Sequence, residues 1–175
     1  LGHCGVPFVK VIYMFHMPAF MFISAYTSKP EKYRFSLYIW KKCRNILFPY
    51  VFWNLLFLAI YIFFEKNKIY IFFAETQSFS VINFFKYLAT TDLGGATWFL
   101  PVIFTASVIY QAIFICLRVF SKERLAPYIA MIIGWGGFQL CQADRFLPYL
   151  LDLSLYSMLY YGLGQLFARH NIFEK

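Results

Sequence analysis

Five long stretches of this chain carry almost no charged side chains, and each approaches the length of a membrane-spanning helix. A helix needs about 20 predominantly apolar residues to cross a bilayer. The stretches cover residues 11–27, 45–64, 93–117, 125–143 and 146–168, and the last contains a single charge, Asp152. We therefore expect an all-α fold, a polytopic transmembrane helix bundle of about five full spans, with the end of an earlier span at residues 1–5.

The composition agrees with a membrane protein. Hydrophobic residues make up 61% of the chain and charged residues 14%, with a mean hydropathy of +0.60. Soluble domains carry roughly 25% charged residues, so a soluble enzyme is excluded. We expect one membrane-embedded domain over residues 1–175, incomplete at both ends and part of a longer protein. Within residues 66–92 the apolar run 69–74 is too short to span a bilayer and polar residues 75–78 interrupt it, which favours an interfacial helix or a partly ordered outer loop over a sixth crossing.

The connections between the apolar stretches alternate between rich and poor in Lys and Arg. Connection 29–44 holds six cations against Glu31, namely Lys29, Lys32, Arg34, Lys41, Lys42 and Arg44. Connection 118–124 is also basic, whereas 65–92 and the turn near residue 144 are balanced. By the positive-inside rule, the basic connections and the last residues lie in the cytoplasm. The net charge of +8 thus predicts topology and contact with anionic membrane lipid, and no nucleic-acid partner.

Two histidines and one aspartate fall within the apolar segments. An imidazole or a carboxylate at membrane depth is costly, and histidine titrates near neutral pH. His3 and His16 would lie at similar depths on neighbouring helices, so we predict that His3, His16 and Asp152 are catalytic. The alternatives are that the histidines bond backbone carbonyls and lock two helices together, and that Asp152 pairs with Arg145 at the interface.

A second group of polar residues opens the 93–117 stretch on the outer side. Asp92, Thr97 and Trp98 flank two glycines, which let the backbone turn and approach a ligand closely. An indole can stack on a sugar face, so we predict that these residues bind substrate. Alternatively, Trp98 belongs to the interfacial aromatic belt.

On the cytoplasmic side, Lys41, Lys42 and Arg44 meet the membrane where the 45–64 stretch begins. Such a cluster can bind the phosphates of a nucleotide-like donor. The positive-inside rule alone would also explain it. No metal site is predicted, because the four cysteines are scattered without metal-ligand spacing.

Several of these segments, in this order, resemble acyltransferase family 3, the integral-membrane O-acyltransferases, and particularly its fucose-4-O-acetylase-like branch. The resembling segments are LGH at 1–3, FHMPAFMFISAY at 15–26, KKCRNILFPY at 41–50, ATWFL at 96–100, and the late block from Leu155 to Gly164. The resemblance covers essentially the whole chain. The FHMP block followed by the basic block is its most specific part.

The resemblance implies an acyl-CoA donor, acetyl-CoA above all, as a cytoplasmic co-substrate, with no bound cofactor. It also implies a glycan or lipid-linked sugar acceptor on the outer side, and a place in the bacterial inner membrane. His3 matches the family's catalytic histidine, as general base or acyl relay, with His16 or Asp152 assisting. The arginine that usually precedes this histidine is missing, and Ala25 replaces a usual glycine.

A multi-span transporter or flippase of a polar metabolite is the competing interpretation, since polar intramembrane residues also mark transport pathways. Such proteins commonly contain internal repeats. No repeat is visible in this sequence, which favours the enzyme. A membrane scaffold without a site is a third interpretation.

Overall fold

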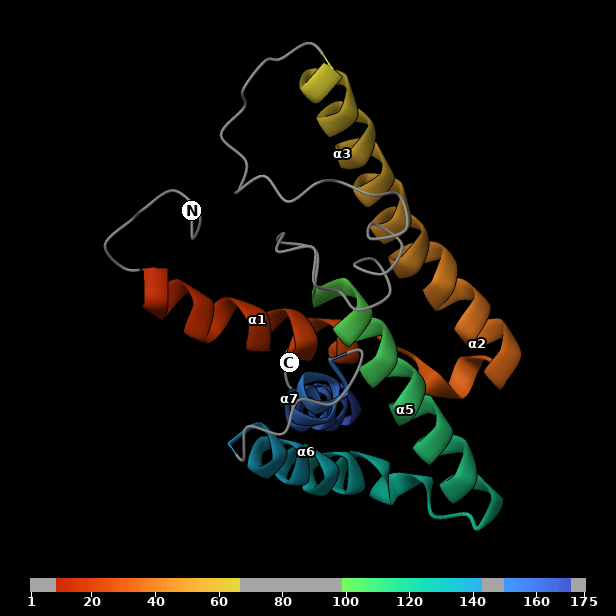
Figure 1. The fold of residues 1–175 in the computed structure, drawn as a ribbon. Coiled ribbons are helices and arrows are strands. Elements are labelled where there is room, and N and C mark those ends of the chain that lie inside the picture. Colours follow the sequence, from red (N-terminus) through yellow and green to blue (C-terminus); the bar gives the residue numbers. More distant parts are fainter. Residues whose placement is uncertain (1–8, 67–98, 143–149, 171–175) are drawn as a thin grey trace.

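The computed structural model describes residues 9–66, 99–142 and 150–170, and within these ranges the chain is helical, without a strand (Figure 1). The five predicted helices all form, with boundaries close to those expected from the apolar stretches. They are α1 (Val9–Tyr26), α3 (Phe48–Lys66), α5 (Phe99–Val119), α6 (Ala126–Gln142) and α7 (Leu151–Arg169). The all-α class is therefore confirmed.

Helix α7 is the centre of the described bundle, because α1, α5 and α6 all pack against it (Figure 1). Its contact with α6 is especially close. A Cβ added at Gly134 or Gly137 of α6 would collide with the α7 backbone, and one at Gly162 would lie 2.6 Å from the Pro127 carbonyl oxygen. Small residues at these positions let the two backbones approach, as is common between membrane helices.

The core consists of two groups of buried side chains. The larger group joins α1, α5, α6 and α7, and consists of Ala25, Ala106, Tyr110, Phe114, Ala126, Ala130, Met158 and Tyr161. The smaller group joins α1 to the start of α5, through Met21, Val102 and Ile103. The small residues lie where helices cross and the aromatic rings fill the space between them, which gives the dense packing of a protein interior.

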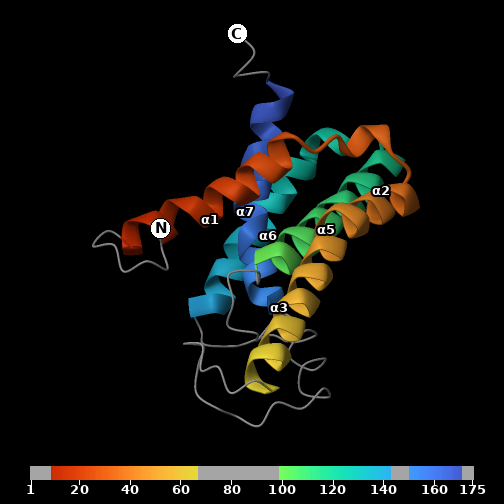
Figure 2. The same ribbon diagram turned by 90° about the horizontal axis from the view of Figure 1, so that it is seen from above.

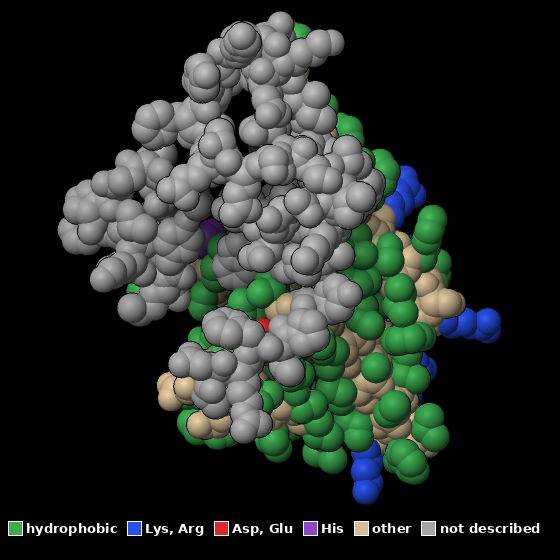
Figure 3. All heavy atoms as spheres, in the orientation of Figure 1, with side chains coloured by type: hydrophobic (Ala, Val, Ile, Leu, Met, Phe, Trp, Pro, Cys, Tyr) green, Lys and Arg blue, Asp and Glu red, His purple; other side chains and the backbone are tan. Residues whose placement is uncertain are grey.

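Many large apolar side chains of the described helices point outward, including Phe48, Phe63, Ile132 and Trp135, each at least 60% exposed. Figure 3 shows hydrophobic side chains spread over the visible part of α5 and its neighbours. Large exposed apolar surfaces of this kind mark contact with a partner or a membrane.

Of the described helices, α5 alone is both long and apolar enough to cross a membrane. The five full spans predicted from the apolar stretches are thus not confirmed. α6 has 17 residues, and α7 carries several buried polar side chains, Asp152, Ser154, Ser157 and Gln165. Polar groups and short length both weaken the apolar signal of a single span.

The basic connection 29–44 is more ordered than the sequence indicated. It contains a 3₁₀ turn, Pro30–Lys32, and a helix, α2 (Phe35–Lys42), that was not predicted. A π-helical turn, Cys43–Leu47, then joins α2 to α3, so that the two form one continuous run beside α5 (Figure 2). A search for long apolar stretches misses α2, because it has only eight residues and ends in two lysines within a basic connection.

Three basic segments meet at one end of the bundle. Arg169, at the end of α7, donates from Nη1 to the Arg124 carbonyl and from Nη2 to that of Glu123, both at 2.9 Å. The Gln111 amide of α5 donates to the Pro30 carbonyl at 3.1 Å. In Figure 3 the Lys and Arg side chains lie along this edge of the molecule. We call it the basic end; the alternating charge pattern predicted that these segments share a side.

Candidate functional site

A pocket of about 410 Å³ opens at the basic end, between the end of α1 and α2. Its walls carry three ammonium groups, several hydroxyls and no carboxylate. We call this the basic pocket; it is lined by Ser24, Thr27, Ser28, Lys29, Tyr33, Tyr38, Lys41, Lys42, Asn45 and Ile46.

Helical spacing explains how α2 supplies one wall of this pocket. Tyr38, Lys41, Lys42 and Asn45 recur at i, i+3, i+4 and i+7, so they share one helix face. The other wall is the last turn of α1, from Ser24 onward. The chain reverses between the two walls through the turn that begins at Pro30, a residue suited to the first position of a helix.

The lysines of the pocket are held beside aromatic rings. Lys41 Nζ lies 3.9 Å from the centre of the Tyr33 ring, and Lys42 Nζ lies 5.6 Å from that of Tyr38. Hydrogen bonding to Lys41 lowers the pKa of the Tyr33 phenol, and burial lowers the pKa of the Lys42 ammonium. Lys42 is thus partly desolvated, and with the exposed Lys29 and Lys41 and no carboxylate on the pocket wall it is well placed to bind an anion such as a phosphate.

A chain of hydroxyls forms the floor of the pocket. Ser28 Oγ lies 3.0 Å from Tyr38 Oη, which lies 3.2 Å from Tyr161 Oη of α7. The Gln165 amide of α7 donates to the carbonyls of Ser28, at 3.0 Å, and Ala25. These bonds tie the end of α1 and α2 to the central helix, so the pocket is built on a fixed base.

Of the three predicted donor-binding residues, the structure brings two together. Lys41 and Lys42 line the basic pocket, whereas Arg44 is exposed and is not among its lining residues. Sequence reasoning missed Lys29 and Tyr33, which reach the pocket only because the chain folds back before α2. The i, i+3, i+4, i+7 pattern starting at Tyr38 was a readable signal for the α2 wall.

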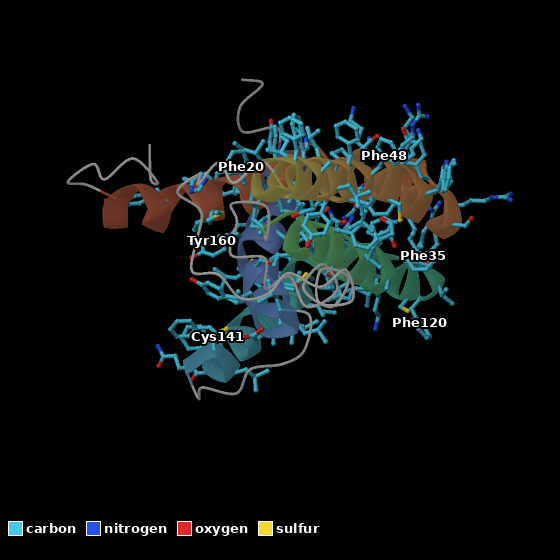
Figure 4. The ribbon with its side chains drawn as sticks, turned by 45° about the horizontal axis from the view of Figure 1, so that its top comes forward. Phe20, Phe35, Phe48, Phe120, Cys141 and Tyr160 are labelled. Carbon is cyan, nitrogen blue, oxygen red and sulfur yellow. The ribbon has the colours of Figure 1, made fainter. Side chains whose placement is uncertain are left out.

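His16 lies in the other half of α1, away from the pocket. Its ring meets Phe20 edge-to-face with centroids 5.3 Å apart, and Phe20 stacks on Phe99 at 5.8 Å. Figure 4 labels Phe20 on α1, at the side where α5 begins. His16 thus borders the smaller core group, against which Phe99 packs.

Asp152 lies in the first turn of α7, at the opposite end from the basic pocket, and is 5% exposed. Within the described residues, its Oδ1 is buried and has no hydrogen-bond partner. Its neighbours Leu150 and Leu153 pack against the same core group that His16 borders. A buried carboxylate oxygen without a donor is costly, which makes it a candidate for contact with a ligand.

The remaining predicted site residues, His3, Asp92, Thr97 and Trp98, lie outside the described residues, as do Arg145 and segment 67–92. The pairing of the two histidines, the alternative ion pair of Asp152 and the outer substrate group all stay predictions.

Comparison with known proteins identifies relatives of the chain. The family model described as "Acyltransferase domain" matches residues 1–175. The chain is similar to nodulation protein NolL of Mesorhizobium japonicum, with 28% identity over 169 residues. The match covers 93% of this chain and 39% of that relative, so the chain spans well under half of its length. No solved structure matches the chain.

Proposed function

Because the chain belongs to the acyltransferase family whose model matches its whole length, we propose that it is part of a membrane O-acyltransferase. The enzyme moves an acyl group, most simply acetyl, from cytoplasmic acyl-CoA to a hydroxyl of a cell-envelope glycan sugar. Its place is the bacterial inner membrane, with the basic end in the cytoplasm.

The basic pocket is the observation that carries this proposal. Coenzyme A presents phosphate groups, and the pocket offers Lys29, Lys41 and Lys42 among hydroxyls, without an acidic side chain on its walls. An anion here would offset the desolvation of the Lys42 ammonium. The positive-inside rule supports a cytoplasmic location, which is where acyl-CoA is found.

The proposed chemistry is an ester-forming transfer. The sugar hydroxyl oxygen attacks the thioester carbonyl while a base removes the hydroxyl proton. The new C–O bond forms as the C–S bond breaks, and the departing CoA thiolate takes up a proton. His3 is the proposed base, with His16 or Asp152 assisting, and Asp92, Thr97 and Trp98 hold the acceptor. General base catalysis of this kind contributes about 10²- to 10⁴-fold.

Helix α1 connects the donor site to this chemistry. His16 and the pocket-lining Ser24 are eight residues apart, which is about 12 Å along a helix at roughly 1.5 Å per residue. For the donor phosphates to lie in the pocket while the thioester reaches the histidine, the arm would have to run along α1 over this distance.

A double substitution tests the donor site in the full-length protein in membrane vesicles. Lys41→Ala with Lys42→Ala should raise the KM for acetyl-CoA at least about tenfold, since a hydrogen bond to a charged group contributes about 1.5–3 kcal/mol. Arg118→Ala with Lys122→Ala is the matched control, because it removes equal charge from exposed positions at the same end. Equal losses in both variants would contradict a specific donor site.

A second substitution tests the proposed base. His3→Ala in the full-length protein should abolish glycan acetylation at unchanged membrane abundance. Retained acetylation would remove His3 from the mechanism. Coupled uptake of a solute without release of CoA would instead support the transporter.

A further inference from the structure

The geometry of the basic pocket points to Tyr33 as a stacking face for the nucleobase of the donor. We infer that the pocket recognises the adenine nucleotide end of acyl-CoA, beyond its phosphates, and that Tyr33 makes the enzyme prefer acyl-CoA to thioester donors that lack a nucleotide. This inference rests on the proposed function.

Tyr33 occupies a suitable place in the pocket wall. It follows the 3₁₀ turn in an extended conformation, with φ −124° and ψ 144°. Its ring is partly exposed and lines the cavity, with Lys41 Nζ over the ring at 3.9 Å and Lys32 Nζ over it at 5.7 Å from its centre. Both belong to flexible, exposed side chains, which can turn to the phosphates when a base stacks on the ring. An aromatic ring beside cations is the usual combination for holding a base and its phosphates.

The other tyrosine of the pocket, Tyr38, is buried and makes hydrogen bonds within the protein. Tyr38 is 3% exposed, and its hydroxyl bonds both Ser28 and Tyr161. Its ring is buried, with Lys42 Nζ over it at 5.6 Å, so it offers no open stacking surface. Among the residues that line the pocket, Tyr33 is therefore the aromatic ring accessible to a ligand.

The size of the pocket agrees with a nucleotide. Small-molecule sites commonly have volumes of about 300–1,000 Å³. The 410 Å³ cavity falls within this range and is much larger than one phosphate requires. Lys29 on the α1 side and Lys41 and Lys42 on α2 place positive charge on both walls, so phosphates can be bound while the base lies against Tyr33.

Two donors that share the thioester arm and its first phosphate separate recognition of the nucleotide end from recognition of the arm. These are acetyl-CoA and S-acetyl-phosphopantetheine, which keeps the arm and its phosphate but has no nucleotide. In the full-length protein, Tyr33→Leu should raise the KM for acetyl-CoA on the order of tenfold, as expected for loss of a stacked base, with kcat retained. The KM for S-acetyl-phosphopantetheine should stay within about twofold. Tyr33→Phe, which keeps the ring, should behave as the wild type.

A measurement on the unmodified protein does not depend on how the variants fold. Adenosine bisphosphate should compete with acetyl-CoA, and pyrophosphate should compete at least about tenfold more weakly. The inference is overturned if Tyr33→Leu affects both donors equally or neither, or if the two inhibitors are equivalent. Transfer from neither donor by the wild-type protein would contradict the proposed function itself, a result distinct from any of these.

Discussion

Lys42 shows how a single residue links the stability of the basic end to ligand binding. It lies in α2, outside the proposed spans, and burial lowers its pKa from the ordinary 10.5. Between the lowered pKa and the ordinary one, the unfolded chain binds more protons than the folded chain. Stability therefore rises with pH through this window. A bound phosphate would favour the charged form and reverse the effect.

Replacing Lys42 by Met should separate the effect of Lys42 on stability from its effect on donor binding. At neutral pH, the melting temperature of this variant should be about 1–4 °C above that of the wild type. Its stability should also increase less than that of the wild type as the pH is raised above neutral. The KM for acetyl-CoA should increase about tenfold, because one phosphate contact is lost. Thermal unfolding between pH 7 and 10, together with kinetics, measures both. Lys122→Met, at an exposed position of the same end, should change neither; a lower melting temperature in Lys42→Met would contradict this reasoning.

Asp152 is a buried ionisable residue at the end of the bundle opposite the basic end. Within the described residues, its buried Oδ1 has no hydrogen-bond partner, so none of those residues stabilises this atom through a hydrogen bond. Asp152→Asn should leave the melting temperature unchanged or higher, while transfer to the acceptor falls about a hundredfold or more if the carboxylate assists proton transfer. Purified protein in detergent serves for both measurements. Full activity with lowered stability would show that Asp152 is structural.

At the scale of elements, the contact between α6 and α7 depends on where glycines lie. Gly134 faces the α7 backbone at Leu159, whereas an added Cβ at Gly136 meets nothing within 4 Å. Gly134→Ala should destabilise the protein by about 1–3 kcal/mol through overpacking. Gly136→Ala, on the same helix, should stabilise it by up to about 1 kcal/mol through helix propensity. Equal melting temperatures for the two variants would show that the close approach of α6 and α7 at Gly134 does not contribute to stability.

The π-helical turn between α2 and α3 is a second feature at the scale of elements, because it affects how the two helices are aligned. The Phe48 amide donates to the Cys43 carbonyl, five residues back, which inserts one extra residue into the run. Deleting Arg44 should remove the extra residue and restore a regular α-helix while the faces of α2 and α3 stay in register, so that Lys41 and Lys42 remain in the pocket. Helix content by circular dichroism and the KM for acetyl-CoA should therefore both be retained, and a strong rise in that KM would contradict this reasoning. Arg44→Ala, which keeps the register, should retain activity because Arg44 does not line the pocket.

At the scale of the whole molecule, the arrangement of ends predicts a topology. Glu31 and Lys122 lie at the basic end and Gln142 at the other, and all three are exposed. Introduced as single cysteines in a cysteine-free full-length protein, positions 31 and 122 should react with an impermeant maleimide only after cells are opened. Position 142 should react in intact cells. Labelling of position 31 from outside would reverse the topology and remove the donor pocket from the acyl-CoA.

The long helices could largely be predicted, because they follow from local apolar runs. Helix α2 could not, since it has only eight residues and lies within a connection that is rich in cations. Among the site residues, Lys41 and Lys42 stood out as neighbours in a basic run. Lys29 and Tyr33 did not, because they reach the same cavity only where the chain reverses at Pro30.

The amino-acid order by itself determined the helical class, the position of each long helix and the clustering of cations at one end, because these depend on apolar run length and on charge along the chain. The tertiary structure alone decided that the end of α1 faces α2 across a basic pocket, and that Asp152 is buried with one oxygen unpaired among the described residues. Contacts between distant segments depend on how closely helices pack, and here that is decided by where glycines allow backbones to meet.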